Sequence, residues 1–334
     1  GPLQEQDTLQ TARPDRTLSL RSILIHLLLF ILAFITATFA GVQWLNLDPL
    51  ELTNFGFGVT YALLLTTMLA AHEFGHYFAA RTHGVSVTLP FFLPFPSLSV
   101  FALLNPFGTL GAVIRLRSAI PSRKVLFDIG AAGPISGFIV SLGILIYGFT
   151  TLPSIEYLYG IHPEYARLET IPEGGWLFGK NLILVAVSSI FSPAGAFIPP
   201  MNEIYHYPFL CVGWFGMLVT AINLIPVGQL DGGHISYAMF GKGYHRIAQI
   251  ALVALALFGL AGFLPGIGID FEYGYTGWLF WAMVLMLFSR VMKLNRPILE
   301  DETPLDPARM MLGWICVAIF ICSFSLTPFS LSAP

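Results

Sequence analysis

The chain has 334 residues, of which 55% are hydrophobic and only 10% are charged, whereas soluble domains carry about 25% charged residues. This composition excludes an ordinary soluble domain and indicates an integral membrane protein. The formal net charge of −3 gives no basic excess, so nucleic-acid binding is also excluded. The three cysteines lie inside apolar runs and are interpreted as packing residues.

The apolar runs predict the organisation of the chain. A helix needs about 20 mostly apolar residues to cross a bilayer. We expect a polar cytoplasmic leader at 1–20, a single membrane-embedded domain at 21–327 with a catalytic core at about 56–240, and a C-terminal tail at 328–334. The sequence predicts an all-α polytopic membrane protein with about seven transmembrane helices, at 22–45, 56–80, 125–151, 207–226, 246–264, 275–292 and 310–327.

The basic residues predict the orientation, because Lys and Arg collect on the cytoplasmic side of a membrane. With the N-terminus inside, all of the 16 Lys and Arg residues except Arg167 and Lys180 fall in inner segments. This distribution favours an odd number of spans and an outer C-terminus. Residues 176–198 are apolar but short, and we expect them to lie at the interface or to re-enter the membrane.

Segment 85–118 is apolar, but prolines interrupt it repeatedly, so it cannot form one straight helix. Its end, "GTLGAVIRLRS", alternates like a β-strand. Non-helical backbone at membrane depth is tolerated only where protein covers it or where it lines a cavity. We therefore predict a membrane-embedded β-hairpin or re-entrant segment that lines a cavity.

The stretch "HEFGH" places ionisable groups late in an apolar run. His72 and His76 are four residues apart, so on a helix they share a face and can bind one metal ion together. Glu73 lies about 100° round the helix, where it can reach a water molecule without ligating the metal. Ionisable groups inside a membrane span are costly and are functional by default. We predict one Zn²⁺ per chain, with Glu73 as general base.

A catalytic zinc ion needs a third protein ligand. Asp231, in "NLIPVGQLDGGH", follows a predicted helix break at Pro226 and Gly228. His234 is the alternative ligand. We favour Asp231, because it would otherwise be an unpaired buried charge, whereas a neutral histidine can donate to a backbone carbonyl.

The remaining ionisable residues are predicted to have ordinary roles. Asp128 is expected to form an ion pair beside Arg123 and Lys124. The other histidines (His26, His83, His162, His206 and His245) are interpreted as structural or loop residues, and the acids of 152–206 (Glu156, Glu164, Glu169, Glu173 and Glu203) as a solvated surface.

Four stretches together resemble the site-2 protease family of intramembrane zinc metalloproteases: "HEFGH", "FGTLGAVIRL", "AAGPISG" and "NLIPVGQLDGGH". The stretch "RPILEDETPLDPARMMLGW" is most similar to the cyanobacterial and plastid subgroup. The resemblance covers nearly all of 56–327. It implies that His72, His76 and Asp231 ligate zinc and that Glu73 activates the water.

The resemblance also implies substrate-binding residues. Asn223 would hydrogen-bond the substrate carbonyl or the oxyanion, although a structural interhelical hydrogen bond explains it equally well. The extended segment 108–116, which includes Gly108, Thr109 and Gly111, would pair with substrate backbone. Such pairing satisfies the backbone groups that a transmembrane helix frees when it unwinds. The PDZ domain or CBS pair of many relatives is not expected here.

The function expected is intramembrane zinc endoproteolysis, in which a peptide bond is cut within or near the transmembrane segment of a membrane protein that has been cut once already. The resemblance implies a bacterial inner, thylakoid or plastid membrane, with the active site toward the cytoplasmic or stromal side. Two alternatives remain. A zinc transporter would need ionisable groups along a path rather than in one cluster, and an inactive scaffold would not need Glu73.

Overall fold

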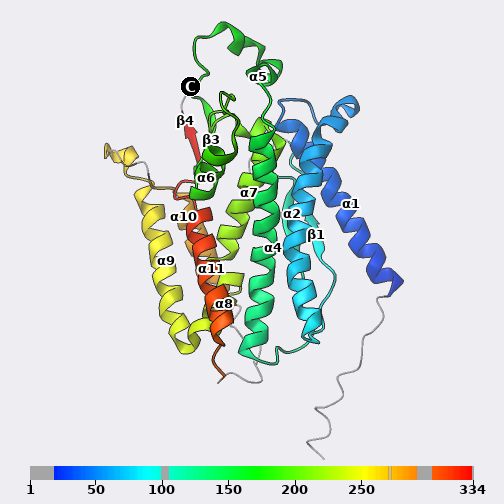
Figure 1. Cartoon of the computed structure of the whole chain (residues 1–334), viewed down its shortest axis with the longest axis vertical. Coiled ribbons are helices and arrows are strands. Elements are labelled where there is room, and N and C mark those ends of the chain that lie inside the picture. The colour runs from blue at the N-terminus through cyan, green and yellow to red at the C-terminus, as the bar shows by residue number, and fades with distance from the viewer. Residues whose placement is uncertain (1–18, 99–104, 270, 272, 292–302, 333–334) are drawn as a thin grey trace, which may run out of the picture.

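The computed structural model describes residues 19–98, 105–269, 271, 273–291 and 303–332, so nearly all of the expected leader lies outside it. The chain is mostly helical (Figure 1). Each of the seven apolar runs contains a long helix. These helices are α1 (Leu20–Gln43), α2 (Phe55–Thr82), α4 (Arg123–Thr150), α7 (Pro208–Asn223), α9 (Tyr244–Ala261), α10 (Gly277–Val291) and α11 (Pro307–Ser323).

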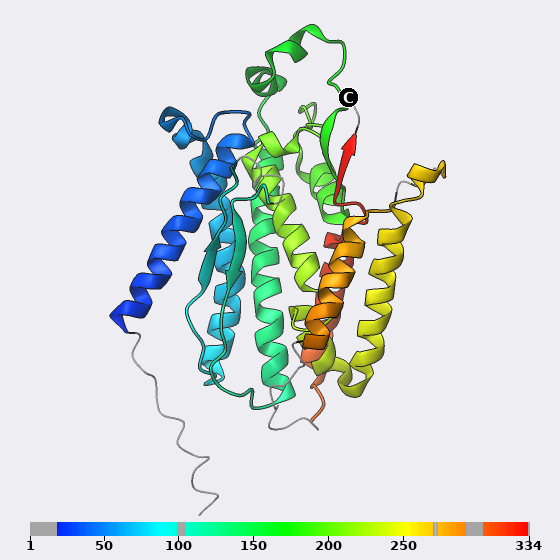
Figure 2. The ribbon, with the colours of Figure 1, turned by 180° about the vertical axis from the view of Figure 1, so that it is seen from behind.

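The long helices stand side by side. Helices α2, α4 and α7 form the centre, α1 covers one side, and α9, α10 and α11 cover the other (Figures 1 and 2). Among the described residues, four helical segments are long and apolar enough to cross a membrane: Leu20–Gln43, Leu52–Thr82, Arg123–Thr150 and Asp231–Ala261. The last of these joins the short helix α8 (Asp231–Phe240) to α9.

Capping residues define where several helices begin. The Ser122 hydroxyl accepts a hydrogen bond from the Val125 amide at the start of α4. The Asp306 carboxylate accepts one from the Arg309 amide at the start of α11. Such side chains satisfy amides that have no partner within the helix. Pro208 and Pro307 occupy first positions of helices, where a missing N–H costs nothing.

Small residues bring the central helices close together. A Cβ at Gly58 of α2 would lie 2.1 Å from the Thr38 carbonyl oxygen of α1. A Cβ at Gly213 of α7 would lie 2.9 Å from the Leu145 side chain of α4. Helices in membranes associate through such close packing, since lipid provides no hydrophobic driving force between them.

The proline-interrupted segment forms an antiparallel pair of strands, β1 (Phe91–Pro94) and β2 (Thr109–Val113), with Phe91 opposite Val113. An isolated bridge between Val87 and Leu116 extends the pairing. The strands run beside α1 and α2 (Figure 2). Part of the segment expected to be extended, 108–116, therefore does form a strand.

A second pair of strands lies at the end of the molecule where α5 (Ile155–Ile161) is placed (Figure 1). Strand β3 (Gly175–Phe178) pairs with β4 (Phe329–Ser332), so the segment expected to be a simple tail is tied to the fold. Helix α6 (Leu182–Phe191) follows β3. Its 10 residues span about 15 Å, half of a hydrocarbon core.

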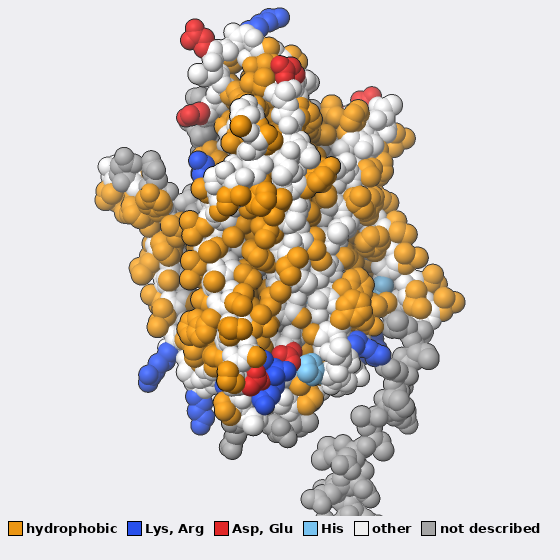
Figure 3. Space-filling view, viewed as in Figure 1, with side chains coloured by type: hydrophobic (Ala, Val, Ile, Leu, Met, Phe, Trp, Pro, Cys, Tyr) orange, Lys and Arg blue, Asp and Glu red, His pale blue; other side chains and the backbone are white. Residues whose placement is uncertain are grey.

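Charged side chains gather at the ends of the helices, and apolar side chains cover the surface between them (Figure 3). The ion pair predicted for Asp128 exists, but the predicted partners are wrong. The Asp128 carboxylate accepts hydrogen bonds from Arg309 Nε at 2.8 Å and Nη2 at 2.7 Å. Arg123 instead donates to the Ala238 carbonyl oxygen. Asp128 thus pairs with a residue of α11 rather than with its neighbours in sequence.

Candidate active site

The "HEFGH" stretch lies in the last third of α2, where its two histidines meet Asp231 at the start of α8. His72 Nε2 and His76 Nε2 are 3.2 Å apart. Asp231 Oδ2 lies 3.2 Å from the first nitrogen and 3.3 Å from the second. The three atoms thus form a nearly equilateral triangle, and both histidines are buried.

The dimensions of this triangle fit a zinc ion. Tetrahedral ligands about 2.0–2.1 Å from zinc are separated from each other by about 3.3 Å. The proton arrangement fits as well, because His76 Nδ1 lies 2.6 Å from the Ile129 carbonyl oxygen, which can only accept. His76 Nε2 in the neutral ring therefore presents a lone pair to the centre of the triangle. Two imidazoles and one carboxylate form a type of donor set that catalytic zinc sites use.

Helix α4 shapes the space for both imidazoles, through residues to which the sequence analysis gave no role. A Cβ at Gly133 would lie 2.0 Å from His76 Nε2, and one at Gly137 would lie 3.1 Å from His72 Nδ1. The two glycines are four residues apart and so share a face. The small-xxx-small spacing within "AAGPISG" was the available signal.

The break between α7 and α8 places Asp231. The chain leaves α7 after Asn223 and turns through Gly228, whose φ of +60° is one that glycine adopts without strain. The Gly228 amide donates to the Tyr244 hydroxyl at 2.7 Å, which holds the turn against α9. Asp231 begins α8 directly after this turn, as the predicted helix break suggested.

A cavity of about 350 Å³ adjoins the triangle and collects most of the predicted site residues. Glu73, Asn223 and His234 line it together with the three clustered residues. His234 is not part of the group whose ligand atoms lie within 4.8 Å of one another. Gly108, Thr109 and Gly111 do not line the cavity. The chemical roles of all these residues stay predictions.

The extended segment instead contributes residues 112–116 to the cavity wall. The Thr88 amide donates to the Arg115 carbonyl, and the Arg117 amide donates to the Ser86 carbonyl, so the polar groups of 115 and 117 face residues 86–88, which precede β1. Because these groups alternate along a strand, those of Ile114 and Leu116 face the opposite edge. Ile114 and Glu73 both line the cavity, so this edge of the strand lies beside the Glu73 carboxylate.

Comparison with known proteins agrees with this geometry. The sequence profile of Peptidase family M50 matches residues 60–264, which is more than half of the chain and includes the complete triangle. The chain belongs to peptidase family M50, the site-2 protease family.

Several curated plant proteins are similar to this M50 chain. The rice (Oryza sativa subsp. indica) protein named probable zinc metalloprotease EGY2, chloroplastic, is 26% identical over 281 residues, which cover 84% of this chain and 43% of the rice protein. The probable zinc metalloprotease EGY1 of Oryza sativa subsp. japonica is 29% identical over 272 residues, or 81% and 40% of the two chains. The Arabidopsis thaliana EGY1 protein is 27% identical over 261 residues, or 78% and 41%. The chain thus spans less than half the length of these relatives.

Proposed function

We propose that this protein is an intramembrane zinc endopeptidase that hydrolyses a peptide bond within or near a transmembrane segment of another membrane protein. The observation that carries the proposal is the His72–His76–Asp231 triangle, which adjoins Glu73 inside an apolar helix layer. Membership of family M50 supports the same conclusion.

In this proposal His72, His76 and Asp231 hold the zinc ion, and Glu73 acts as general base. When bound, zinc supplies a Lewis acid that polarises the scissile carbonyl and makes water acidic enough to be deprotonated near neutral pH. Glu73 takes the proton from the attacking water and passes it to the leaving amine. Asn223, which lines the cavity at the end of α7, would donate to the carbonyl oxygen of the substrate.

We propose that the substrate binds as an added strand. A peptide bond inside a helix is shielded, so the segment must unwind before it is cut, and its freed backbone groups then need partners. The edge formed by Ile114 and Leu116 offers such partners beside Glu73. This assignment places the pairing a few residues further along the chain than Gly108, Thr109 and Gly111.

The membrane arrangement belongs to the proposal as well. We propose a single membrane-embedded domain over 21–327, with seven spans and the strand pair β1–β2 at membrane depth. The end of the molecule where α4 begins, with its Lys and Arg residues, would face the cytoplasm or stroma. His72 is nine residues from Arg81, a rise of about 13 Å, so water can reach the site from that side. The partners are lipid and a membrane protein that has been cut once before.

Replacement of Glu73 by glutamine tests the function. Glu73→Gln keeps the shape of the side chain but removes the base, so cleavage of a synthetic transmembrane substrate in detergent should fall about 10²–10⁴-fold. The zinc content should stay at the wild-type value, since the ligands are unchanged. Glu156→Gln, which alters an exposed residue, is the control. Undiminished cleavage in Glu73→Gln would contradict the mechanism, and zinc transport or scaffolding would survive the change.

A further inference from the structure

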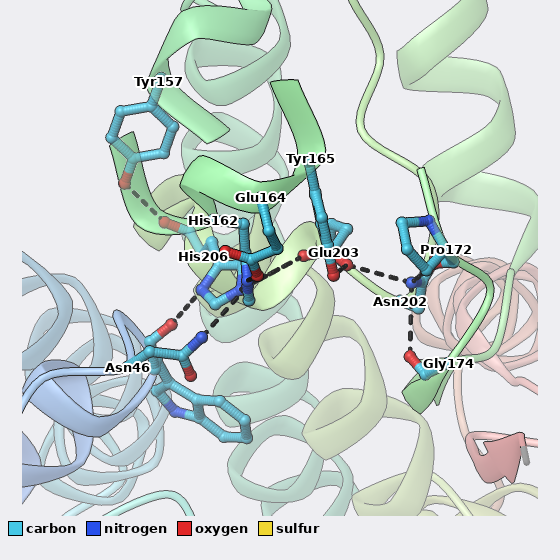
Figure 4. Close-up of polar contacts among 11 residues, drawn as sticks. Asn46, Tyr157, His162, Glu164, Tyr165, Pro172, Gly174, Asn202, Glu203 and His206 are labelled. Atoms are coloured by element: carbon cyan, nitrogen blue, oxygen red, sulfur yellow. Dashed lines mark hydrogen bonds and ion pairs between the residues drawn. The ribbon is translucent and has the colours of Figure 1, made fainter. Parts of the chain in front are cut away.

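A second cluster of metal-binding side chains lies at the end of the molecule where α5 is placed (Figures 1 and 4). His162 follows α5, whereas Glu203 and His206 flank and end the 3-10 helix η3 (Ile204–His206) that leads into α7. The Nε2 atoms of His162 and His206 are 3.0 Å apart. Glu203 Oε2 lies 3.2 Å from His206 Nε2 and 3.8 Å from His162 Nε2. Three potential ligand atoms therefore face one point.

The cluster is more buried than the sequence suggests. The side chains of His206 and Glu203 are 0% and 2% exposed, and that of His162 is 16% exposed. The expectation that Glu203 belongs to a solvated surface is therefore wrong. The expectation that the buried ionisable groups form one cluster also fails, because this group is separate from the His72–His76–Asp231 triangle.

Hydrogen bonds at the far side of each ring determine where the protons lie. His206 Nδ1 donates to the carbonyl oxygen of Trp44, which can only accept. His162 Nδ1 donates to Glu164 Oε1 at 2.9 Å. In a neutral imidazole the other nitrogen then carries a lone pair. Two lone pairs and a carboxylate oxygen thus face each other, and such an arrangement calls for a cation.

The two carboxylate oxygens of Glu203 have different surroundings. Oε1 accepts hydrogen bonds from the Tyr165 hydroxyl and the Asn202 amide, both at 3.1 Å (Figure 4). Oε2 is buried and has no hydrogen-bond partner among the described residues. An unpaired buried carboxylate oxygen is costly, and a metal ion would remove this cost.

We propose that His162, Glu203 and His206 bind a second zinc ion. Two imidazoles and one carboxylate are a donor set that suits zinc rather than Mg²⁺ or Ca²⁺. The three separations, 3.0, 3.2 and 3.8 Å, lie around the value of about 3.3 Å expected for tetrahedral ligands. The Asn46 Nδ2 amide donates to His162 Nε2 at 3.1 Å, and a metal ion would replace this hydrogen bond at that nitrogen.

The site would fasten three parts of the chain together. His162 belongs to the loop after α5, Glu203 and His206 precede α7, and the Trp44 carbonyl that orients His206 caps α1. The Tyr157 hydroxyl adds a hydrogen bond to the His206 carbonyl oxygen at 2.6 Å. Helix α7 runs from this point to Asn223 at the active-site cavity, and its 16 residues cover about 24 Å. The zinc would hold the start of the helix that carries Asn223.

This second site does not make the protein a zinc transporter. The sequence of α7, "PFLCVGWFGMLVTAIN", contains no Asp, Glu, His, Lys or Arg between the two clusters. A metal ion would find no series of ligands along that helix. The second site is therefore structural, and its existence does not depend on the protease activity.

The test is the zinc content of the purified full-length chain, equilibrated with buffered zinc in detergent and freed of unbound metal. Glu203→Gln has nearly the same volume and can still accept from Tyr165, but it removes the anionic ligand oxygen. His162→Ala removes a ligand from the least buried position. Both variants should hold one zinc fewer per chain than wild type. His245→Ala, an exposed histidine outside both clusters, should hold the wild-type amount.

The difference between wild type and variant is the measurement, so incomplete occupancy of the active site does not affect it. Limited proteolysis provides a second measurement, in which zinc should protect the 151–175 region of wild type and not of Glu203→Gln. If His162→Ala fails to fold, the zinc content of Glu203→Gln relative to wild type is the deciding measurement. In the metal-free alternative, His206 Nε2 carries a proton and donates it in a hydrogen bond to Glu203 Oε2. Equal zinc content in wild type and both variants would establish that alternative and overturn the proposal.

Discussion

The contact between Gly133 and His76 allows a strict test of the proposed zinc site. The Gly133→Ala substitution adds one methyl group to α4, and this carbon would lie 2.0 Å from His76 Nε2 and 2.3 Å from Cε1. Ordinary van der Waals contact begins near 3.4 Å. The imidazole or the helix must therefore move by about 1.4 Å, and a misplacement of about 1 Å can cost 10²-fold in rate.

We expect Gly133→Ala to bind zinc more weakly and to cleave a synthetic transmembrane substrate at least about 100-fold more slowly. The protein should still fold, because alanine is the better helix former by about 1 kcal/mol. Zinc content by elemental analysis and cleavage in detergent are measured on the same sample. Titration with zinc then separates a loss of affinity from a loss of rate.

Gly143→Ala is the matched control. Gly143 lies in the same helix, and a Cβ at that position would meet nothing within 4 Å. This variant should keep the zinc content and the cleavage rate of wild type. If Gly133→Ala behaved in the same way, the close packing of α4 against His76 would not position the ligand, and the reasoning would be refuted.

Two further predictions concern the contacts that hold the fold together. Asp128→Asn removes the charge that Arg309 and His83 share, and it should lower the free energy of unfolding by about 2 kcal/mol. Denaturant unfolding in detergent measures this change, with the exposed Asp48→Asn as control, and equal effects would contradict it. Phe329→Ala removes from β4 a ring whose centroid lies 5.3 Å from that of Phe178 and 5.1 Å from that of Trp214. It should cost about 3 kcal/mol, whereas Phe263→Ala, at an exposed position, should cost much less. If the thermal midpoint fell no further in Phe329→Ala than in Phe263→Ala, the packing of β4 through this ring would contribute little to stability.

The sequence was sufficient for the features that depend on neighbouring residues. The positions of the seven long helices follow from runs of apolar side chains, and the pairing of His72 with His76 follows from their spacing on one helix turn. Asp231 could also be nominated, because a carboxylate next to a helix break in an apolar region needs a partner. The structure brings these three residues together, while their chemical roles stay predictions.

Other features became visible only once the chain was folded. Asp128 pairs with Arg309 rather than with its neighbours in sequence, and β4 pairs with β3 although about 150 residues separate them. His162, Glu203 and His206 had each been given an ordinary role, because nothing in their spacing sets them apart. Periodicity in a sequence reports the geometry of one helix or strand, which the nearest few residues determine. Which side chains meet across elements depends on how the whole chain packs, and a buried carboxylate differs from an exposed one only by that packing.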